Sequence, residues 1–205
     1  MLHHPTIALI ERRVSASLFD PTHALTDSEI EYLVSLATRA PSAYNLQNWR
    51  FIAIRSPEEK ARLCELAYGQ KKVSQAAVTF IVCGQMPDPN TIVERLRPAV
   101  KSGHMPSSVA LDWQDHAKTK FMDRRLSRDE AVRSATFAAA TLIYAAEAMD
   151  LVSGPMTGFD VEAVTREFGI EDGEFPVMLL PVGRPAPGNW PQKPRRPLSE
   201  VLEMS

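Results

Sequence analysis

The feature that most constrains how this chain folds is an uncharged run of 13 residues, Ser134 to Ala146. It is too short to span a membrane, which needs about 20 apolar residues. Upstream, Ser127-Arg128-Asp129-Glu130 has the form of a capping box and predicts a helix that opens there and continues to about Asp150. Because Ala135 to Ala146 is apolar on nearly all sides, we expect this helix to be buried all round, at the centre of the fold.

Two more helix starts are marked by capping boxes. Thr26 to Glu29 precedes apolar residues spaced for one helix face, and Pro41 lies beyond the expected end of that helix. Ser56 to Glu59 has Pro57 at the first helical position, where the missing N–H costs nothing. A helix is also expected from His4 to Arg13.

The strand candidates are Trp49 to Arg55, Val78 to Gly84, Pro176 to Val182 and, more briefly, Leu151 to Ser153. Pro181 suggests an edge strand or a strand end for the third of these. A few strands among more helices, without strict alternation, predict an α+β fold with one sheet. The length of 205 residues predicts a single domain over 1–205.

Composition excludes several classes of function. The net charge of −2 and pI near 6.2 offer no electrostatic basis for binding nucleic acid or an anionic membrane. The two cysteines, Cys64 and Cys83, sit in apolar runs without a second thiol or a histidine at ligand spacing. We therefore expect a reducing compartment and no metal site. Since Met1 to Ile10 lacks the marks of a signal peptide, a cytoplasmic location is predicted.

The C-terminal segment is rich in proline: Pro185 to Pro197 contains five of the chain's 16 prolines. It should be extended, because proline cannot continue a helix; a short helix or turn from Leu198 to Met204 is expected after it. An extended segment here has little to pack on within its own domain. Either it is disordered, or 185–205 forms an arm on another subunit; the apolar Trp190, Leu198, Val201 and Leu202 favour the arm.

Four segments could carry chemistry, and each also has a plainer interpretation. Arg12-Arg13-Val14-Ser15 could clamp a phosphate or could complement a helix dipole. Pro41 to Trp49 presents neutral donors and acceptors suited to a heterocycle, or is a polar connection. Gly154 to Asp160 allows close approach to a flat ligand, or is a tight turn. Lys193 to Pro197 could bind an anion or be a solvated tail.

Other familiar chemistries are missing from the sequence. It contains no dinucleotide-binding glycine fingerprint, no phosphate-binding loop of the Walker type, no serine-hydrolase elbow and no zinc-protease motif. The histidines lack metal-ligand spacing, and no pair of carboxylates stands out. The chemistry has to come from the four segments together.

Taken together and in this order, the segments resemble the FMN-dependent nitroreductase family. Pro41 to Trp49 reads P-S-A-x-N-x-Q-x-W and, with Ala37 and Ala40, is similar to the family's A-x-x-A-P-S-x-x-N-x-Q-P-W; Asn48 replaces the usual proline. Four other stretches resemble family motifs: Arg13 to Asp20, Gly69 to Val73 with Ala76, Pro155 to Asp160, and Lys193 to Arg195. Five motifs in register are strong evidence, and they cover roughly the whole chain.

The resemblance implies a mostly antiparallel central sheet flanked by helices, in an intertwined homodimer whose C-terminal arm embraces the partner. FMN would sit at the dimer interface. Arg13, Ser15, Lys193 and Arg195 would hold its phosphate and ribityl end, and Gln70 and Lys72 the polar edge of its ring. The full implied cofactor set is Arg13, Val14, Ser15, Ser17, Pro41, Ser42, Ala43, Asn45, Gln70, Lys72, Pro155, Met156, Thr157, Gly158, Lys193 and Arg195, with Pro41 to Asn45 coming from the other subunit.

The implied activity is transfer of electrons from NAD(P)H to a nitroaromatic, quinone or enone by a ping-pong mechanism through FMN, without a protein nucleophile. Ser17, Thr157 and Val14 differ from common family residues, which implies a changed redox potential. A different flavin reaction, such as dehydrogenation or dehalogenation, and a non-catalytic FMN-storage or redox-sensing protein remain alternatives.

The region 87–127 corresponds to the family's variable helical cover over the flavin. Ile92, Leu96 and Val100 predict one helix and Val109 to His116 a second, with a break between them. Ile92 and Leu96 suit plain packing. Met105 and Trp113, beside a Gly/Pro break, suit an adaptable acceptor pocket. We expect them to affect the choice of acceptor while FMN occupancy stays nearly constant.

Overall fold

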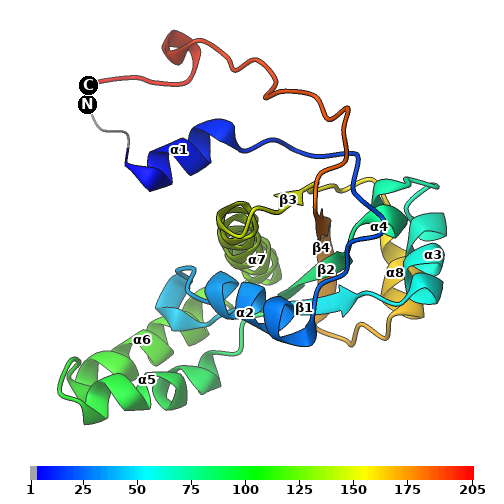
Figure 1. Cartoon of the computed structure of the whole chain (residues 1–205). Helices are drawn as coiled ribbons and strands as arrows, with labels where there is room; N and C mark the ends of the chain where they lie inside the picture. The colour runs from blue at the N-terminus through cyan, green and yellow to red at the C-terminus, as the bar shows by residue number, and fades with distance from the viewer. Residues whose placement is uncertain (1–3) are drawn as a thin grey trace.

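The computed structural model describes residues 4–205 and has an α+β architecture (Figure 1). Its helices are α1 (Pro5–Arg12), α2 (Asp27–Ala37), α3 (Pro57–Leu66), α4 (Lys72–Gln75), α5 (Ile92–Lys101), α6 (Ser107–Lys120), α7 (Arg124–Ala148) and α8 (Val161–Glu167). Its strands are β1 (Trp49–Ile54), β2 (Val78–Gln85), β3 (Val152–Ser153) and β4 (Glu174–Gly183), and short 3-10 turns are η1 (Ala43–Asn45), η2 (Pro89–Thr91) and η3 (Leu198–Glu200).

Within residues 4–205 the strands form one four-stranded antiparallel sheet in the order β1-β2-β4-β3. This confirms the predicted fold class. Of the two alternatives for Pro181, the edge strand is wrong, because β4 lies between β2 and β3, and the strand end is confirmed, because β4 ends at Gly183. Pro181 is tolerated there because it lies near the end of β4, where its carbonyl accepts from the Gly154 N–H at 3.0 Å. Pro176 pairs with Cys83 at an irregularity in the ladder, which is also where a strand accepts proline.

Helices cover both faces of the sheet (Figure 1). On one face α2 and α7 pack against β2 and β4 in a large apolar cluster that includes Leu33, Leu142 and Phe80. On the other face α3 and α8 contribute Leu63 and Val164 to a second cluster. The approach of α7 is close: a Cβ on Gly84 would lie 3.1 Å from the backbone oxygen of Ala131.

The start of α7 differs from the prediction. The helix begins at Arg124, and the Asp123 carboxylate accepts from the backbone N–H groups of Arg125 at 2.8 Å and Leu126 at 3.2 Å. Ser127, predicted as the cap, lies inside the first turn, and its hydroxyl donates to the Phe121 carbonyl at 2.9 Å. The capping-box prediction at Ser127 is wrong because Asp123 already satisfies the first amides one turn earlier.

The prediction that α7 is buried all round is also wrong for the chain by itself. Phe137 is 49% exposed and Tyr144 38% exposed, and Ile7 and Ile10 of α1 are exposed as well. An ion pair of Arg12 with Glu147, at 3.1 Å, joins α1 to α7. Large exposed apolar side chains on two joined helices suit an interaction surface.

The C-terminal segment begins on its own chain. Phe19 and Pro185 form a β-bridge, and the side-chain oxygen of Asn189 accepts from the backbone N–H groups of Ser17 and Leu18. The expectation that this segment has little to pack on in its own domain is therefore wrong for 185–189. From Lys193 onward its residues are exposed, and with α1 they form the upper part of the molecule in Figure 1.

Both predicted helices of the 87–127 region are confirmed as α5 and α6, which project together from the body (Figure 1). They enclose a small apolar cluster of their own with Leu46. None of the helices within residues 4–205 combines the length and hydrophobicity needed to cross a bilayer. The prediction made on Met1 to Ile10 includes residues 1–3, which lie outside the described residues.

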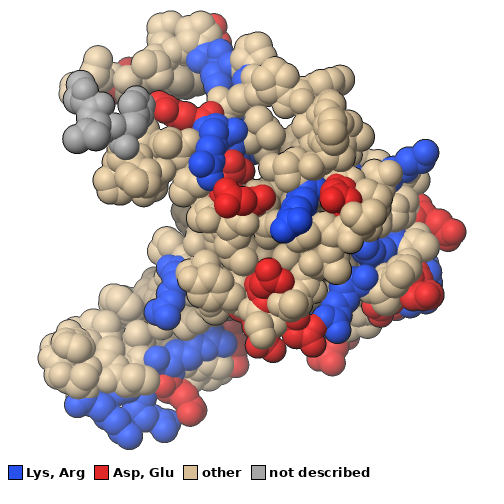
Figure 2. Space-filling model, in the orientation of Figure 1, with Lys and Arg blue, Asp and Glu red and all other residues tan. Residues whose placement is uncertain are grey.

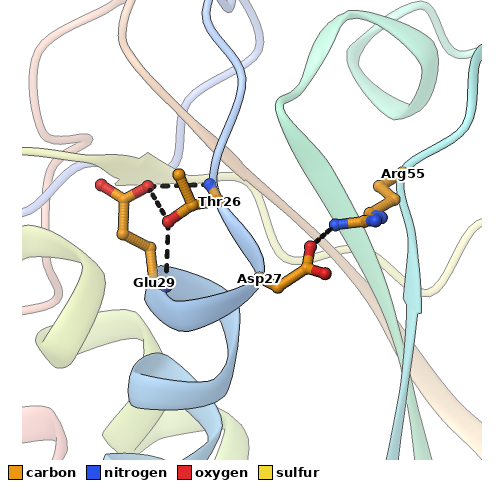
Figure 3. Close-up of polar contacts among 4 residues, drawn as sticks. All are labelled: Thr26, Asp27, Glu29 and Arg55. Carbon is orange, nitrogen blue, oxygen red and sulfur yellow. Dashed lines mark hydrogen bonds and ion pairs between the residues drawn. The ribbon is translucent and has the colours of Figure 1, made fainter.

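The capping box at the start of α2 is confirmed (Figure 3). The Thr26 hydroxyl accepts from the Glu29 N–H at 3.3 Å, and a Glu29 carboxylate oxygen accepts from the Thr26 N–H at 2.8 Å. The Thr26 hydroxyl also donates to this carboxylate oxygen at 2.8 Å, and the bonds from the Thr26 N–H and the Thr26 hydroxyl lower the pKa of the Glu29 carboxyl. Asp27 forms an ion pair with Arg55, directly after β1. The start of α2 is thereby tied to the sheet.

Replacing Thr26 with alanine should lower the free energy of unfolding by about 0.5–2 kcal/mol, because the Glu29 N–H loses the hydroxyl that caps it, whereas the Thr26 N–H keeps its bond to the Glu29 carboxylate. Urea unfolding measures the change. Thr119→Ala is the matched control: the Thr119 hydroxyl donates to the Asp115 carbonyl on exposed α6, so no terminal amide depends on it. Equal destabilisation by the two substitutions would contradict the capping role.

Candidate functional site

A cavity of about 500 Å³ lies where the two ends of the chain meet the body. The N-terminal segment after α1, the first residue of α4, the turn after β3 and the C-terminal segment contribute to it. Its lining residues are Arg13, Ser15, Ala16, Ser17, Lys72, Pro155, Trp190, Pro191, Gln192, Lys193 and Arg195. Three of the four segments singled out in the sequence are thus brought together, although they are up to about 180 positions apart in the printed sequence.

Backbone contacts fix one wall of this cavity. Ser15 forms a parallel bridge with Ser153, and the Ala16 N–H donates to the Ser153 carbonyl at 2.8 Å. A Cβ on Gly154 would lie 2.3 Å from the Ala16 carbonyl oxygen, so only glycine permits this approach. On the opposite wall the Gln192 side-chain amide donates to the Arg13 carbonyl at 3.1 Å. Both ends of the chain are held against the site.

The cavity carries a local excess of positive charge. Arg13, Lys72, Lys193 and Arg195 line it, and no acidic residue is found among its lining residues in the described part of the chain. Burial lowers the pKa of the Lys72 ammonium, and the positive charge of Lys193 lowers it further. The face shown in Figure 2 has interspersed basic and acidic patches. The excess of positive charge is therefore a property of the cavity and not of this whole face. A bound phosphate group would neutralise this positive charge, and the hydroxyls of Ser15 and Ser17 could form hydrogen bonds with such a ligand.

The turn after β3 lies beside the cavity and is joined to the start of α4. Gln70 donates from its side-chain amide to the Gly158 carbonyl at 2.9 Å, which links two of the predicted ligand-contacting segments. Met156 pairs with Leu179 through backbone hydrogen bonds of 2.9 Å, and its side chain is buried in the core. Thr157 and Gly158 are exposed and available to a ligand.

The remaining predicted group, Pro41, Ser42, Ala43 and Asn45, does not line this cavity in the single chain. It lies in and around η1, between β1 and the α5–α6 pair. Three non-glycine residues there have left-handed backbone angles: Tyr44, Asn45 and Gln47, with φ of 53°, 54° and 51°. Such residues cost of order 1–3 kcal/mol each and gather at functional sites. The segment therefore lies apart from the cavity, and its role in the site stays a prediction.

Met105 and Trp113 also lie away from the cavity. Both are partly buried against the apolar cluster of the α5–α6 pair. The Trp113 ring lies 6.0 Å from the Tyr44 ring at 72°, centroid to centroid, inside the Pro41–Asn45 region. A substitution of Trp113 therefore also disturbs that region, whereas the structure shows no such ring contact for Met105 among the described residues.

Sequence reasoning missed several lining residues. Ala16, Pro191 and Gln192 carry no motif of their own, although Gln192 stands next to the Lys193–Arg195 motif. Trp190 was expected on another subunit; here its ring has the Lys193 ammonium 5.8 Å from its centroid. Asn189, which holds the Ser17 and Leu18 backbone, left no signal in the sequence. Val14 is half-buried beside the cavity without lining it.

Across residues 4–205, no group of three His, Cys, Asp or Glu side chains is arranged to hold a metal ion. Cys64 and Cys83 are free cysteines. Burial raises the pKa of the Cys83 thiol to about 12, so this thiol is inert at neutral pH. The chemistry the site offers is therefore that of cations, hydroxyls and amides around an anion.

Comparison with known proteins agrees with this geometry. The chain matches the Nitroreductase family over residues 10–184. YodC of Bacillus subtilis, whose name describes an NAD(P)H nitroreductase, is 29% identical over 197 residues, which is 96% of each chain. The oxygen-insensitive NAD(P)H nitroreductase of Salmonella typhimurium is 27% identical over 86% of this chain and 87% of its own.

Two solved structures share the fold. The crystal structure of the B. subtilis nitroreductase-type protein ydfN has a TM-score of 0.89 and 27% identity, with 97% of each chain covered. A protein of the same type from Exiguobacterium sibiricum, crystallised in complex with FMN, has a TM-score of 0.89 and 24% identity, covering 100% of this chain and 99% of that one. The similarity extends over the whole described chain.

Proposed function

The chain belongs to the nitroreductase family, and from this premise we propose that it is an FMN-dependent oxidoreductase. It takes electrons from NAD(P)H and passes them to an electron-poor organic acceptor: a nitroaromatic, a quinone or an enone. The observation that carries the proposal is the cavity of about 500 Å³ with four cations around it. Its charge suits a phosphate.

The residues present fit FMN. Arg13, Ser15, Lys193 and Arg195 hold the phosphate and ribityl end, because they combine charge with hydroxyl and fork-shaped donors. Lys72 and Gln70 serve the polar edge of the ring system. Met156, Thr157 and Gly158, joined to Gln70 by its bond to the Gly158 carbonyl, form the adjoining strip. A fingerprint for a dinucleotide is missing from the sequence, which favours FMN over FAD.

The site is completed by a second copy of the chain. Pro41 to Asn45 do not line the cavity of their own chain, and in this proposal they serve the cavity of a partner in a homodimer. The exposed apolar face formed by Ile7, Ile10, Phe137 and Tyr144 supports this, as do the exposed Leu198 and Leu202 near the C-terminus. Analytical ultracentrifugation at the flavin absorbance band should show a dimer; a flavin-loaded monomer would overturn this part of the proposal.

When bound, FMN supplies the hydride-accepting and hydride-donating chemistry, so the chain needs no nucleophile of its own. Lys72 and Gln70 orient the ring and balance charge at its polar edge. Ser17 presents a hydroxyl rather than a cation, and Thr157 is neutral; both set the potential at which electrons pass. NAD(P)H and the acceptor occupy the same open side in turn, which gives ping-pong kinetics.

Steady-state oxidation of NADH and NADPH with a nitroaromatic, a quinone and an enone tests the proposal directly. Turnover well above that of free FMN, with parallel double-reciprocal lines, is expected. Turnover no faster than free FMN would instead indicate a flavin-storage or redox-sensing protein. The cytoplasmic location stays a prediction.

Arg195→Ala should weaken FMN retention more than Arg196→Ala. Arg195 lines the cavity, and an arginine–phosphate hydrogen bond is worth about 1.5–3 kcal/mol, or roughly ten- to a hundredfold in affinity. FMN content after extensive dialysis measures retention. Unchanged retention in both variants would leave Lys193 to Arg196 as a solvated tail.

The affinity for FMN should fall as the pH rises from neutrality toward the usual lysine pKa of about 10.4. Because burial and Lys193 lower the pKa of Lys72, this lysine loses its charge below the usual lysine pKa of about 10.4, and the bound anion loses a partner. Lys72→Met should bind FMN more weakly at pH 7 and show a flatter pH dependence. Lys71→Met, on the exposed neighbour, should behave as the unmodified protein. A wild-type affinity independent of pH would contradict the prediction.

We also propose that Met105 and Trp113 influence the choice of acceptor. For Trp113, whose ring contacts Tyr44, the expectation of constant FMN occupancy is replaced by an expected loss of FMN retention, and only Met105 keeps the original expectation. Met105 lies in the break between α5 and α6, next to His104 and two residues after Gly103 with a φ of 75°. Met105→Ala should change kcat/KM for one acceptor relative to another by several-fold, with FMN occupancy constant, because a flexible thioether shapes an adaptable pocket. Equal loss with every acceptor, together with a lower melting temperature, would place Met105 in the core only.

A further inference from the structure

The segment 42–47, here called the Tyr44 loop, adopts a conformation that needs external support. Tyr44, Asn45 and Gln47 all have positive φ, and Tyr44 is a bulky residue for which this conformation is rare. Within the loop, the Ser42 hydroxyl accepts from the Gln47 N–H at 2.8 Å. Two backbone bonds also close the turn, from the Asn45 N–H to the Ser42 carbonyl at 3.1 Å and from the Leu46 N–H to the Ala43 carbonyl at 3.0 Å. None of these bonds uses the Tyr44 side chain, so they do not explain why a tyrosine stands at the strained position.

The Tyr44 ring is held by side chains at the end of α6. Its centroid lies 6.0 Å from that of Trp113 and 6.2 Å from that of Phe121, and both pairs are edge-to-face, at 72° and 89°. The Lys120 ammonium lies 5.7 Å from the Tyr44 centroid and 5.2 Å from the Phe121 centroid. Edge-to-face pairs and cation–π contacts are directional, so they fix the orientation of the ring.

Lys120 is itself positioned by a buried carboxylate of α7. Glu130 is 3% exposed, and its oxygens lie 4.0 Å from the Lys120 ammonium and 2.5 Å from the Arg133 guanidinium. The Ser134 hydroxyl donates to the same carboxylate at 3.2 Å. The chain of contacts therefore runs from α7 through Lys120 to the Tyr44 ring.

The backbone of the Tyr44 loop is held from α5 as well. The Arg95 guanidinium donates to the Leu46 carbonyl, and the Leu46 side chain is buried in the cluster between α5 and α6. Both helices of the pair thus contact the loop, one through its backbone and the other through the Tyr44 ring. The loop and the α5–α6 pair form one packed unit.

We propose that Tyr44 is a positioning residue: its ring, clamped by Trp113, Phe121 and Lys120, holds the Tyr44 loop in the shape with which Ser42, Ala43 and Asn45 meet the FMN of the partner subunit. Tyr44 acts through these neighbours. The inference rests on the proposed function, because it takes FMN as the ligand that the loop contacts. It makes flavin retention depend on side chains of the α5–α6 pair that lie outside the phosphate cavity.

The test is the dissociation constant for FMN, measured on the holoprotein by the recovery of free-flavin fluorescence on serial dilution. Tyr44→Ala removes the ring; Tyr44→Gly removes it but favours the left-handed backbone; Tyr44→Phe keeps the ring. Tyr32→Ala, on the exposed face of α2, is the matched control. We expect Tyr44→Phe and Tyr32→Ala to stay within about twofold of the unmodified protein, and Tyr44→Ala and Tyr44→Gly to be weakened about tenfold or more, because a loop that leaves its binding conformation lowers the apparent affinity by the fraction of molecules still in that conformation.

The Tyr44→Gly variant distinguishes two reasons for a tyrosine at position 44: the left-handed backbone alone, or the contacts of the ring. If Tyr44→Gly binds FMN as well as the unmodified protein, the position requires only a left-handed backbone, and the clamp is overturned. Unchanged affinity in Tyr44→Ala overturns it as well. Loss of affinity in Tyr44→Phe equal to that in Tyr44→Ala would assign the role to the hydroxyl instead of the ring and would also overturn it.

Trp113→Leu keeps the test decisive if the Tyr44 variants do not fold, as judged by circular dichroism. It removes a ring partner from α6 without touching the loop. A weakening of FMN binding by several-fold supports the clamp, and an unchanged dissociation constant overturns it. Failure of the proposed function has a different signature, because then the unmodified protein itself retains no FMN.

Discussion

The packing of α7 against the sheet is the interaction on which the other parts of the structure depend. Small residues allow this helix to approach β2 closely: its buried face carries Ala135, Ala138 and Ala139, and Gly84 of β2 lies opposite Ala131. The same helix presents Phe137 and Tyr144 on its outer face and carries Glu130 near its start. The single helix α7 therefore contributes to the core, to the proposed dimer surface and to the support of the Tyr44 loop.

The candidate site lies at the junction of chain ends rather than inside the core. The N-terminal segment and the C-terminal segment are tied to each other by Asn189 and Gln192 and to the sheet by the bridge at Ser153. This arrangement gathers four cations without a nearby acid among the lining residues. The repulsion between them is tolerated because three of the four lie on segments exposed to solvent on at least one side, and it becomes useful when an anion binds.

Local signals in the sequence predicted local structure well. The capping boxes at Thr26 and Ser56, the four strands and the two helices of the 87–127 region all correspond to observed elements. The errors share one cause, which is competition from a neighbour that the local pattern does not show. Asp123 caps α7 ahead of Ser127, β3 covers the outer edge of β4, and the segment after Arg13 accepts the C-terminal segment that was expected to lack a partner.

By itself, the sequence determined the fold class, the family and most of the charged residues of the site, because motif residues and helix caps depend on spacing along the chain. Only the tertiary structure decided which of these residues meet. It separated Pro41 to Asn45 from the cavity, added Trp190 and Gln192 to it, and placed the Tyr44 ring between Trp113 and Phe121. Contacts between residues distant in sequence depend on the relative placement of whole elements, and that placement is set by core packing, which a one-dimensional pattern does not encode.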